Sequence, residues 1–276
     1  MNFQLNLDTL FNPKGIAVIG ASTHPGKFGF VALHNILAAG FDGNIFATNP
    51  MTPEILGVQT LESVKSIPAN SIDVAMICLG PEQTIAVLPE LAEKGVKAGF
   101  VVSGGFRESG FEGIELEKEL VEVANSLEIT IAGPNGQGFV STPANLCSQI
   151  VSPYPPLGNI SIASQSGNIL SAMLNQARAK NIGIARAISI GNQAQVDIAE
   201  YIRYFGRDPE TKVIVSYVEG LPNGRDFYDS LKEVSGGKPV IIIRGGTTSD
   251  GAKAASSHTG SMASDQKIFE TAVSQA

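Results

Sequence analysis

The sequence predicts an α/β protein made of two domains, the first of them doubly wound. Short, β-branched and largely apolar runs such as "GIAVIGA" and "KVIVSYVEG" alternate with longer helical patterns along the whole chain. Because these runs lack alternating polar residues, we expect parallel strands that are covered on both faces. The chain has 276 residues, of which 43% are hydrophobic. At roughly 100–200 residues per domain, this length allows two domains with separate cores.

The first half of the chain contains an alternating series of strands and helices. Helical patterns occupy residues 29–39, 82–94 and 112–126. Strands are expected before, between and after them, at "GIAVIGA", "NIFATN", "DVAMICLG", "AGFVVSGG" and "ITIAGPN". This order predicts one doubly wound domain over residues 1–140.

A second series follows a proline-rich segment. Residues 140–159, "VSTPANLCSQIVSPYPPLGN", carry four prolines and little periodicity, so we expect an irregular crossing between the domains. The second domain is predicted over residues 150–276, and no helix stop signal precedes Ala276, so we expect it to continue beyond this sequence. Its strands are expected at "ISIAS", "ARAISIG", "KVIVSYVEG" and "KPVIIIRGG", and its helices over 167–180, 196–205, 224–234 and the end of the chain.

The composition argues against several classes of protein. The formal charge is −7 and the pI about 5.0, and no long basic block occurs, so we expect no nucleic-acid partner. The sequence has neither a recognisable secretion signal nor an apolar run long enough to span a membrane. Cys78 and Cys147 are too few for a disulfide framework or a zinc site. We therefore expect a cytoplasmic enzyme or binding protein without a resident metal.

The stretch "VIGASTHPGKFG", residues 18–29, is the first candidate for a ligand site. A glycine-rich turn between a strand and a helix lets backbone N–H groups approach a phosphate, whose charge the helix dipole favours. Phe28 stands where a Walker A loop has Ser or Thr, which argues against that motif. A plain tight turn is the alternative. An NAD site is disfavoured, because Asn49 and Pro50 follow the second strand where a ribose-binding carboxylate is expected.

Small or turn-forming residues end each strand of the first domain. Because the carboxyl ends of parallel strands share one edge of a sheet, these turns together predict a ligand cleft there. They are Gly20 to Ser22, Asn49-Pro50, Leu79-Gly80-Pro81, Ser103-Gly104-Gly105-Phe106 and Gly133-Pro134-Asn135.

The second domain offers another candidate site for an anion. "IASQSGN" places Ser164, Gln165, Ser166 and Gly167 between a strand and a helix, in a second turn suited to an anion. Glu219 ends the strand "VSYVEG" and could orient an imidazole ring through its second N–H, although it could equally be a surface carboxylate.

His258 lies alone among small residues in "AASSHTGSMASD". An accessible imidazole beside helix N-termini is suited to carry a phosphoryl group, because its nitrogen can attack phosphorus while backbone amides neutralise the charge. A solvated loop histidine is the simpler alternative.

These motifs together resemble the NDP-forming acyl-CoA synthetases, a superfamily that includes succinyl-CoA synthetase and ADP-forming acetate–CoA ligase. The resemblance rests on "IAVIGASTHPGKFG", "GPNGQG", "ISIASQSGN", "ISIGNQAQVD", "YVEG" and the loop around His258, and is closer to the acetate–CoA ligase alpha-type branch. It implies a Rossmann-like CoA-binding domain followed by a flavodoxin-like (succinyl-CoA synthetase-like) domain. The implied reaction is acid + CoA + NTP giving acyl-CoA + NDP + phosphate, through acyl phosphate and phosphohistidine.

The resemblance also implies roles for individual residues. His258 would carry the phosphoryl group, and Glu219 would steady its ring. Residues that would bind the phosphoryl group are Ser164, Gln165, Ser166, Gly167, Thr259 and Gly260. Residues that would bind CoA are Gly20, Ala21, Ser22, Lys27, Gly29, Asn49, Pro50, Pro81, Ser103, Gly104 and Asn135.

The chain departs from the family pattern at a few positions. Gly136 and Gln137 replace a Cys and a hydrophobic residue of "GPNCxG", and Gln193 and Gln195 replace Lys and Asp of "GNKADVD". Met51 replaces the Lys of "NPK".

The resemblance implies further components as well. The family's ATP-grasp domain is not recognisable in this sequence, so a partner domain or subunit is expected to bind ATP or ADP with Mg. A small carboxylic acid substrate and an oligomer are also expected. The alternative function is a non-catalytic CoA-binding regulatory module, as in CoA-dependent protein acetyltransferases, which would not need the histidine.

Overall fold

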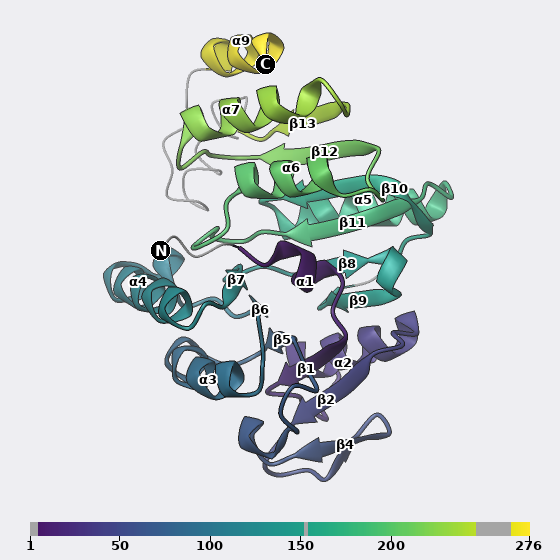
Figure 1. Cartoon of the computed structure of the whole chain (residues 1–276), viewed down its shortest axis with the longest axis vertical. Helices are drawn as coiled ribbons and strands as arrows, with labels where there is room; N and C mark the ends of the chain where they lie inside the picture. The colour runs from purple at the N-terminus through teal and green to yellow at the C-terminus, as the bar shows by residue number, and fades with distance from the viewer. Residues whose placement is uncertain (1–4, 152–153, 247–265) are drawn as a thin grey trace.

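The computed structural model describes residues 5–151, 154–246 and 266–276. Two α/β units, each built on its own sheet, lie one above the other along the long axis of the molecule (Figure 1). The predicted α/β class is therefore confirmed. No helix of the described residues is long and apolar enough to cross a membrane.

The first unit is a mainly parallel sheet in the order β3-β4-β2-β1-β5-β6-β7. All strand pairs are parallel except the short β3–β4 pair. Helix α2 packs on one face, while α3 and α4 pack on the other (Figure 1). The strands are β1 (Gly15–Ile19), β2 (Asn44–Thr48), β3 (Glu54–Ile55), β4 (Val58–Leu61), β5 (Val74–Ile77), β6 (Ala98–Val101) and β7 (Thr130–Ala132), and the helices are α2 (Phe28–Ala39), α3 (Pro81–Glu93) and α4 (Phe111–Ser126).

The second unit is a six-stranded sheet in the order β13-β12-β10-β11-β8-β9. Its four later strands are parallel, and β8 and β9 join antiparallel at one edge. Helix α5 packs on one face, against β10 and β11, and α6 packs on the other. The elements are β8 (Gly138–Ser141), β9 (Leu146–Gln149), β10 (Leu157–Ser164), α5 (Gly167–Ala179), β11 (Ile184–Ser189), α6 (Ile198–Arg207), β12 (Val213–Val218), α7 (Gly224–Ser235), β13 (Val240–Arg244) and α9 (Gln266–Gln275).

The prediction of an irregular crossing over residues 140–159 is wrong for the first half of that segment. Residues 146–149 form β9, and together with β8 they extend the second sheet before residue 150. All residues of both strands are buried, but each strand is only four residues long, too short for a periodicity to be read. The domain limits at 140 and 150 stay a prediction, since the second sheet takes its edge strands from the residues around them.

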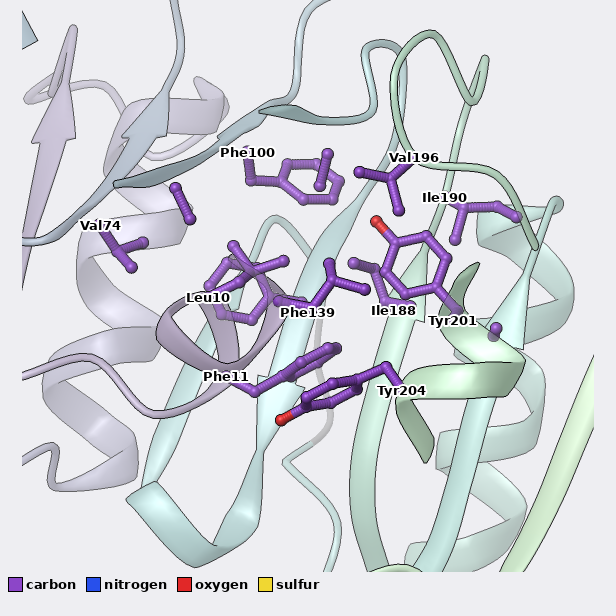
Figure 2. Close-up of a cluster of buried hydrophobic side chains, with 14 of the residues drawn as sticks. Leu10, Phe11, Val74, Phe100, Phe139, Ile188, Ile190, Val196, Tyr201 and Tyr204 are labelled. Atoms are coloured by element: carbon purple, nitrogen blue, oxygen red, sulfur yellow. The ribbon is translucent and has the colours of Figure 1, made fainter. Parts of the chain in front are cut away.

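A short N-terminal helix, α1 (Leu7–Phe11), joins the two units and was not predicted. Leu10 and Phe11 are fully buried in one continuous apolar cluster with residues of both sheets. The ring of Phe11 stacks on Tyr204 of α6 at a centroid distance of 5.3 Å and meets Phe139 of β8 edge-on at 5.9 Å (Figure 2). The ring centroid of Phe139 in turn lies 6.0 Å from that of Phe100 in β6. The two units therefore share a core.

Candidate functional site

The loop after β1 is held tightly by its glycines. Gly20 has φ +84°, in the left-handed region that favours glycine. A Cβ atom on Gly29 would lie 2.1 Å from the carbonyl oxygen of Gly20. The first turn of α2 therefore packs directly on the loop, and neither position accepts a side chain. Ala21 is buried, Ser22 is half-buried and Lys27 is exposed, and no side-chain hydrogen bond caps α2.

Asn49 joins the loops that follow β1 and β2. Its Nδ2 donates to the carbonyl oxygen of Ala21 at 2.8 Å. Its Oδ1 accepts from the backbone N–H groups of Met51 at 2.8 Å and Thr52 at 2.9 Å. The position where an NAD site would carry a carboxylate thus holds a neutral amide whose contacts lie within the protein. Pro50, beside it, is exposed.

A cavity of about 300 Å³ lies where the two units meet. It brings together Gly104 and Asn135, predicted from the first unit, with Gln165, Ser166 and Gly167, predicted from the second. The predicted residues of the loop after β1 do not line it, nor do Asn49, Pro50, Pro81, Ser103 and Ser164. Its other lining residues are Phe28, Val102, Gly136, Gln137, Ile150, Asn168 and Ser189.

The predicted residues outside the cavity lie beside its walls. The backbone N–H of Asn135 donates to the carbonyl oxygen of Ser103 at 3.0 Å. A Cβ atom on Gly105 would lie 2.9 Å from Cγ of Pro81, so the start of α3 packs on the 103–106 loop. The carboxyl ends of β5, β6 and β7 are therefore in mutual contact, as the sequence predicts.

Side chains support the turn between β10 and α5 internally. Ser164 Oγ donates to the carbonyl oxygen of Ser166 at 2.7 Å, and Ser166 Oγ caps α5 by accepting from the N–H of Ile169 at 3.4 Å. The amide of Gln165 reaches the loop after β12: Nε2 donates to the carbonyl of Gly220 at 2.7 Å, and Oε1 accepts from the N–H of Glu219 at 2.5 Å. The Gln165 amide therefore positions Glu219.

Gln137 lines the cavity, although the sequence marks it only as a departure from the family pattern. Its Oε1 accepts from Ser171 Oγ at 2.8 Å, and its Nε2 donates to Asn168 Oδ1 at 3.3 Å. A Cβ atom on Gly167 would lie 2.4 Å from Cδ of Gln137, so the side chain of Gln137 lies directly over the first residue of α5. Phe28 and Asn168 also line the cavity without having been predicted, and no sequence signal marks them.

The other residues that depart from the family pattern lie in different parts of the structure. Gly136 is tightly enclosed, because a Cβ atom there would lie 2.4 Å from the carbonyl oxygen of Ser189. Met51 is 87% exposed. Gln193 Oε1 accepts from the N–H of Ile198 at the start of α6, at 3.2 Å, and Gln195 Oε1 accepts from the N–H of Ile131 at 2.5 Å.

Glu219 lies at the carboxyl end of β12, beside the end of β13. Burial, together with the charge of Glu219 and a hydrogen bond to it, raises the pKa of Tyr217. A Cβ atom on Gly245 would lie 2.4 Å from the Tyr217 hydroxyl and 3.2 Å from Cγ of Glu219. The carboxylate is thus close to the residue that follows β13. His258, Thr259 and Gly260 lie outside the described residues.

A polar cluster at the junction of the units completes the neighbourhood of the cavity. Asn192, which follows β11, donates from Nδ2 to Glu108 at 2.6 Å and to Glu117 at 2.8 Å. Burial raises the pKa of Glu117, against hydrogen bonding by Asn192 and the charge of Arg107. Burial acts in the same sense on Glu108, but hydrogen bonds from Asn192 and from the backbone of Gly105 and Phe106 bring its pKa below the ordinary value.

Among the described residues, no group of His, Cys, Asp and Glu could hold a metal ion.

Comparison with known families and proteins assigns both units. The family described as "CoA binding domain" matches residues 14–142, and the family described as "Succinyl-CoA ligase like flavodoxin domain" matches residues 157–276. The chain thus combines a CoA-binding domain with a succinyl-CoA ligase-like flavodoxin domain, the pair that the resemblance to the NDP-forming acyl-CoA synthetases implies. The predicted resemblance and the predicted Rossmann-like and flavodoxin-like folds are confirmed.

Individual relatives match almost the whole chain. The chain is 38% identical to subunit alpha of the ADP-forming acetate–CoA ligase I of Pyrococcus furiosus, over 98% of its own length and 59% of the relative's. It is 39% identical to the ADP-forming acetate–CoA ligase of Methanocaldococcus jannaschii, over 96% of its own length and 37% of the relative's. The chain therefore spans less than two thirds of the length of each of these relatives.

Solved structures agree with this assignment. The dinucleotide-forming acetyl-coenzyme A synthetase 1 of Ca. Korarchaeum cryptofilum, in complex with phosphate and ADP, matches with a TM-score of 0.91 and 39% identity, over 98% of this chain and 58% of that chain. A protein of Pyrococcus horikoshii OT3 matches with a TM-score of 0.83 and 36% identity, over 96% of this chain and 60% of that one.

Proposed function

We propose that this chain is the CoA-binding and phosphohistidine-carrying part of an ADP-forming acid–CoA ligase. The complete reaction is acid + CoA + ATP giving acyl-CoA + ADP + phosphate, run reversibly through acyl phosphate and phosphohistidine. The observation that carries the proposal is the cavity at the junction of the units. In it, loops from the carboxyl edge of the first sheet face the N-terminus of α5 in the second.

The first unit would bind CoA along the carboxyl ends of its strands. The exposed ammonium group of Lys27 and the first turn of α2 supply positive charge and N–H groups for phosphates, and Gly20 and Gly29 let the backbone come close. Ser103, Gly104 and Asn135 would continue the site toward the cavity, where the thiol and the acyl group would meet. Ala21, Ser22, Asn49, Pro50 and Pro81 would complete it.

The second unit would move the phosphoryl group. A ring nitrogen of His258 would attack the phosphorus of an acyl phosphate, the bond from phosphorus to the acyl oxygen would break, and the acid would leave as its carboxylate. The phosphoryl group would then pass to ADP, and the reverse steps would use ATP. Glu219 would hold the ring by accepting its other N–H. Ser164, Gln165, Ser166, Gly167, Thr259 and Gly260 would surround the phosphoryl oxygens at the N-terminus of α5.

The proposal requires components outside this chain. An ATP-grasp domain or subunit would bind the nucleotide with Mg and would receive the phosphoryl group from His258, in an oligomer. The substrate would be a small carboxylic acid, and the protein would act in the cytoplasm.

The test is transfer of labelled phosphate to the protein. Wild-type protein, incubated with γ-labelled ATP and extract of the native host to supply the nucleotide-binding partner, should take up acid-labile label, because a phosphorus–nitrogen bond hydrolyses in acid. The His258→Asn variant should take up none. The matched control is His34→Asn, since His34 is exposed on α2. Equal labelling of the wild type and His258→Asn would contradict the proposal.

A further inference from the structure

Asn192 follows β11 of the second unit, and each of its hydrogen-bonding groups contacts a residue of the first unit. Its backbone N–H donates to the carbonyl of Pro134 at 2.8 Å, and its carbonyl oxygen accepts from the guanidinium of Arg107. Its side chain donates to Glu108 and Glu117, and its Oδ1 accepts from Asn135 Nδ2 at 3.3 Å. The residue is only 7% exposed. A residue of the second unit is therefore saturated by partners from the first.

These contacts require a carboxamide. Two hydrogens on one nitrogen satisfy two carboxylates, while the oxygen of the same group accepts from Asn135. The carboxylate of Glu117 is buried, where it is costly without donors, and Arg107 pairs with it at 3.5 Å. Glu108 is exposed, and Asn192 is a side-chain donor to it as well. An Asp side chain at position 192 would have the same shape but would remove both donors and add a third negative charge.

The contacts of Asn192 lead directly to the cavity. Glu108, held by Asn192 through one oxygen, uses the other to accept from the N–H groups of Gly105 at 2.6 Å and Phe106 at 3.2 Å. A Cβ atom on Gly104 would lie 2.8 Å from Glu108 Oε1 and 3.2 Å from Asn135 Oδ1. Gly104 and Asn135, both in the cavity wall, therefore rest on groups that Asn192 holds.

The backbone at Gly191, beside Asn192, packs closely on the first unit. Gly191 has φ +57°, and a Cβ atom on it would lie 2.1 Å from the carbonyl oxygen of Pro134. The loop after β11 thus packs against the 133–135 turn without intervening side chains.

We infer that Asn192 is a positioning residue for the CoA cleft: from the second unit, it fixes the 103–106 loop and Asn135 of the first unit in the geometry that binds CoA. The inference rests on the proposed function, since it names CoA as the ligand of that cleft. If Asn192 has this role, the cleft binds CoA only while the two units are docked as they are in this structure.

The experiment compares Asn192→Asp with Gln195→Glu. Both variants change an amide to a carboxylate in the same loop, and both residues contact the first unit. Gln195, however, contacts Ile131, Asn125 and Ile129, which do not line the cavity. Two quantities are measured: hydrogen exchange of the backbone amides over residues 103–108, and the Kd for CoA by calorimetry at pH 8 and pH 6.

Asn192→Asp should speed exchange at Gly105 and Phe106, because Glu108 loses its donor and turns away. Loss of charge-assisted hydrogen bonds should weaken CoA binding at pH 8 by about tenfold. Relative to Gln195→Glu, part of that loss should be recovered at pH 6. Facing Glu108 and Glu117, with Arg107 the cation nearby, the introduced carboxyl group takes up a proton readily and can then donate a hydrogen bond. A purely structural defect would not recover in this way.

Two results would overturn the inference. The first is hydrogen exchange over residues 103–108 that is equally fast in Asn192→Asp and Gln195→Glu. Faster exchange with an unchanged Kd would also overturn it, because the loop would then move without consequence for the ligand. Wild-type protein that binds no CoA would contradict the proposed function instead. In that case the exchange measurement alone would decide whether Asn192 fixes the loop.

Discussion

At the scale of single residues, neutral amides join the loops at the strand ends. Asn49 connects the loops after β1 and β2, Gln165 connects the ends of β10 and β12, and Asn192 connects the two units. An amide donates and accepts at once and adds no charge beside an anionic ligand. The sequence marks Asn49 and Gln165 as ligand-binding residues. Their contacts in the structure are with neighbouring backbone, and their contact with ligands stays a prediction.

Gly167 and Gln137 should behave as a coupled pair. Gln137→Ala removes two hydrogen bonds and should lower the free energy of unfolding by about 1–2 kcal/mol. Gly167→Ala should displace the Gln137 side chain, because the new Cβ atom would overlap Cδ of Gln137 at 2.4 Å, and should lose the same contacts. The double variant should therefore lose less than the sum of the single losses. Urea unfolding of the three variants measures this, and additive losses would show that the two residues act separately.

At the scale of elements, the sequence predicts well where the strands and helices are long. The helical patterns at 29–39, 82–94 and 112–126 agree closely with α2, α3 and α4, since each buries one face on a sheet. The sequence does not predict five short elements, namely α1, β3, β4, β8 and β9, whereas strands as short as β7 are predicted because each is an apolar run between helical patterns. A segment that short has no readable period, and its structure comes from tertiary packing rather than from its own residues.

Helix α1 illustrates this dependence on packing. Phe11 is fully buried and contacts Tyr204, Phe139 and Phe205. Phe11→Ala should lower the free energy of unfolding by about 3–5 kcal/mol, because the cavity left lies in a core that both units share. Thermal or urea unfolding measures the loss. The control is Phe111→Ala, at a residue 79% exposed, which should change stability little. A loss equally small for both variants would mean that α1 does not hold the units together.

At the scale of the whole molecule, the two units are joined by both apolar and polar contacts. The shared core around Phe11 and Phe139 contributes the apolar contacts (Figure 2). The cluster around Asn192 contributes hydrogen bonds between the loops that carry the cavity. From the sequence, the loops at the strand ends could be predicted to form a cleft. That Asn192 belongs to the site could not, because its partners are 57 to 85 residues away along the chain.

The joined core predicts cooperative unfolding of the two units. A calorimetric scan should give one transition in which the calorimetric and van't Hoff enthalpies agree. Fluorescence or circular dichroism should report the same midpoint. Two separated transitions, each with its own midpoint, would mean that the contacts at the junction are too weak to couple the sheets.

Phosphorylation of His258 can be measured on this chain without any partner. The purified chain is incubated with acetyl phosphate, digested at alkaline pH and examined by mass spectrometry. We expect one added phosphoryl group on the peptide that contains His258, lost on brief acid treatment and absent from the His258→Asn variant. Phosphate found only on other residues, or a modification of the His258 peptide that survives acid, would show that His258 is not the phosphoryl carrier.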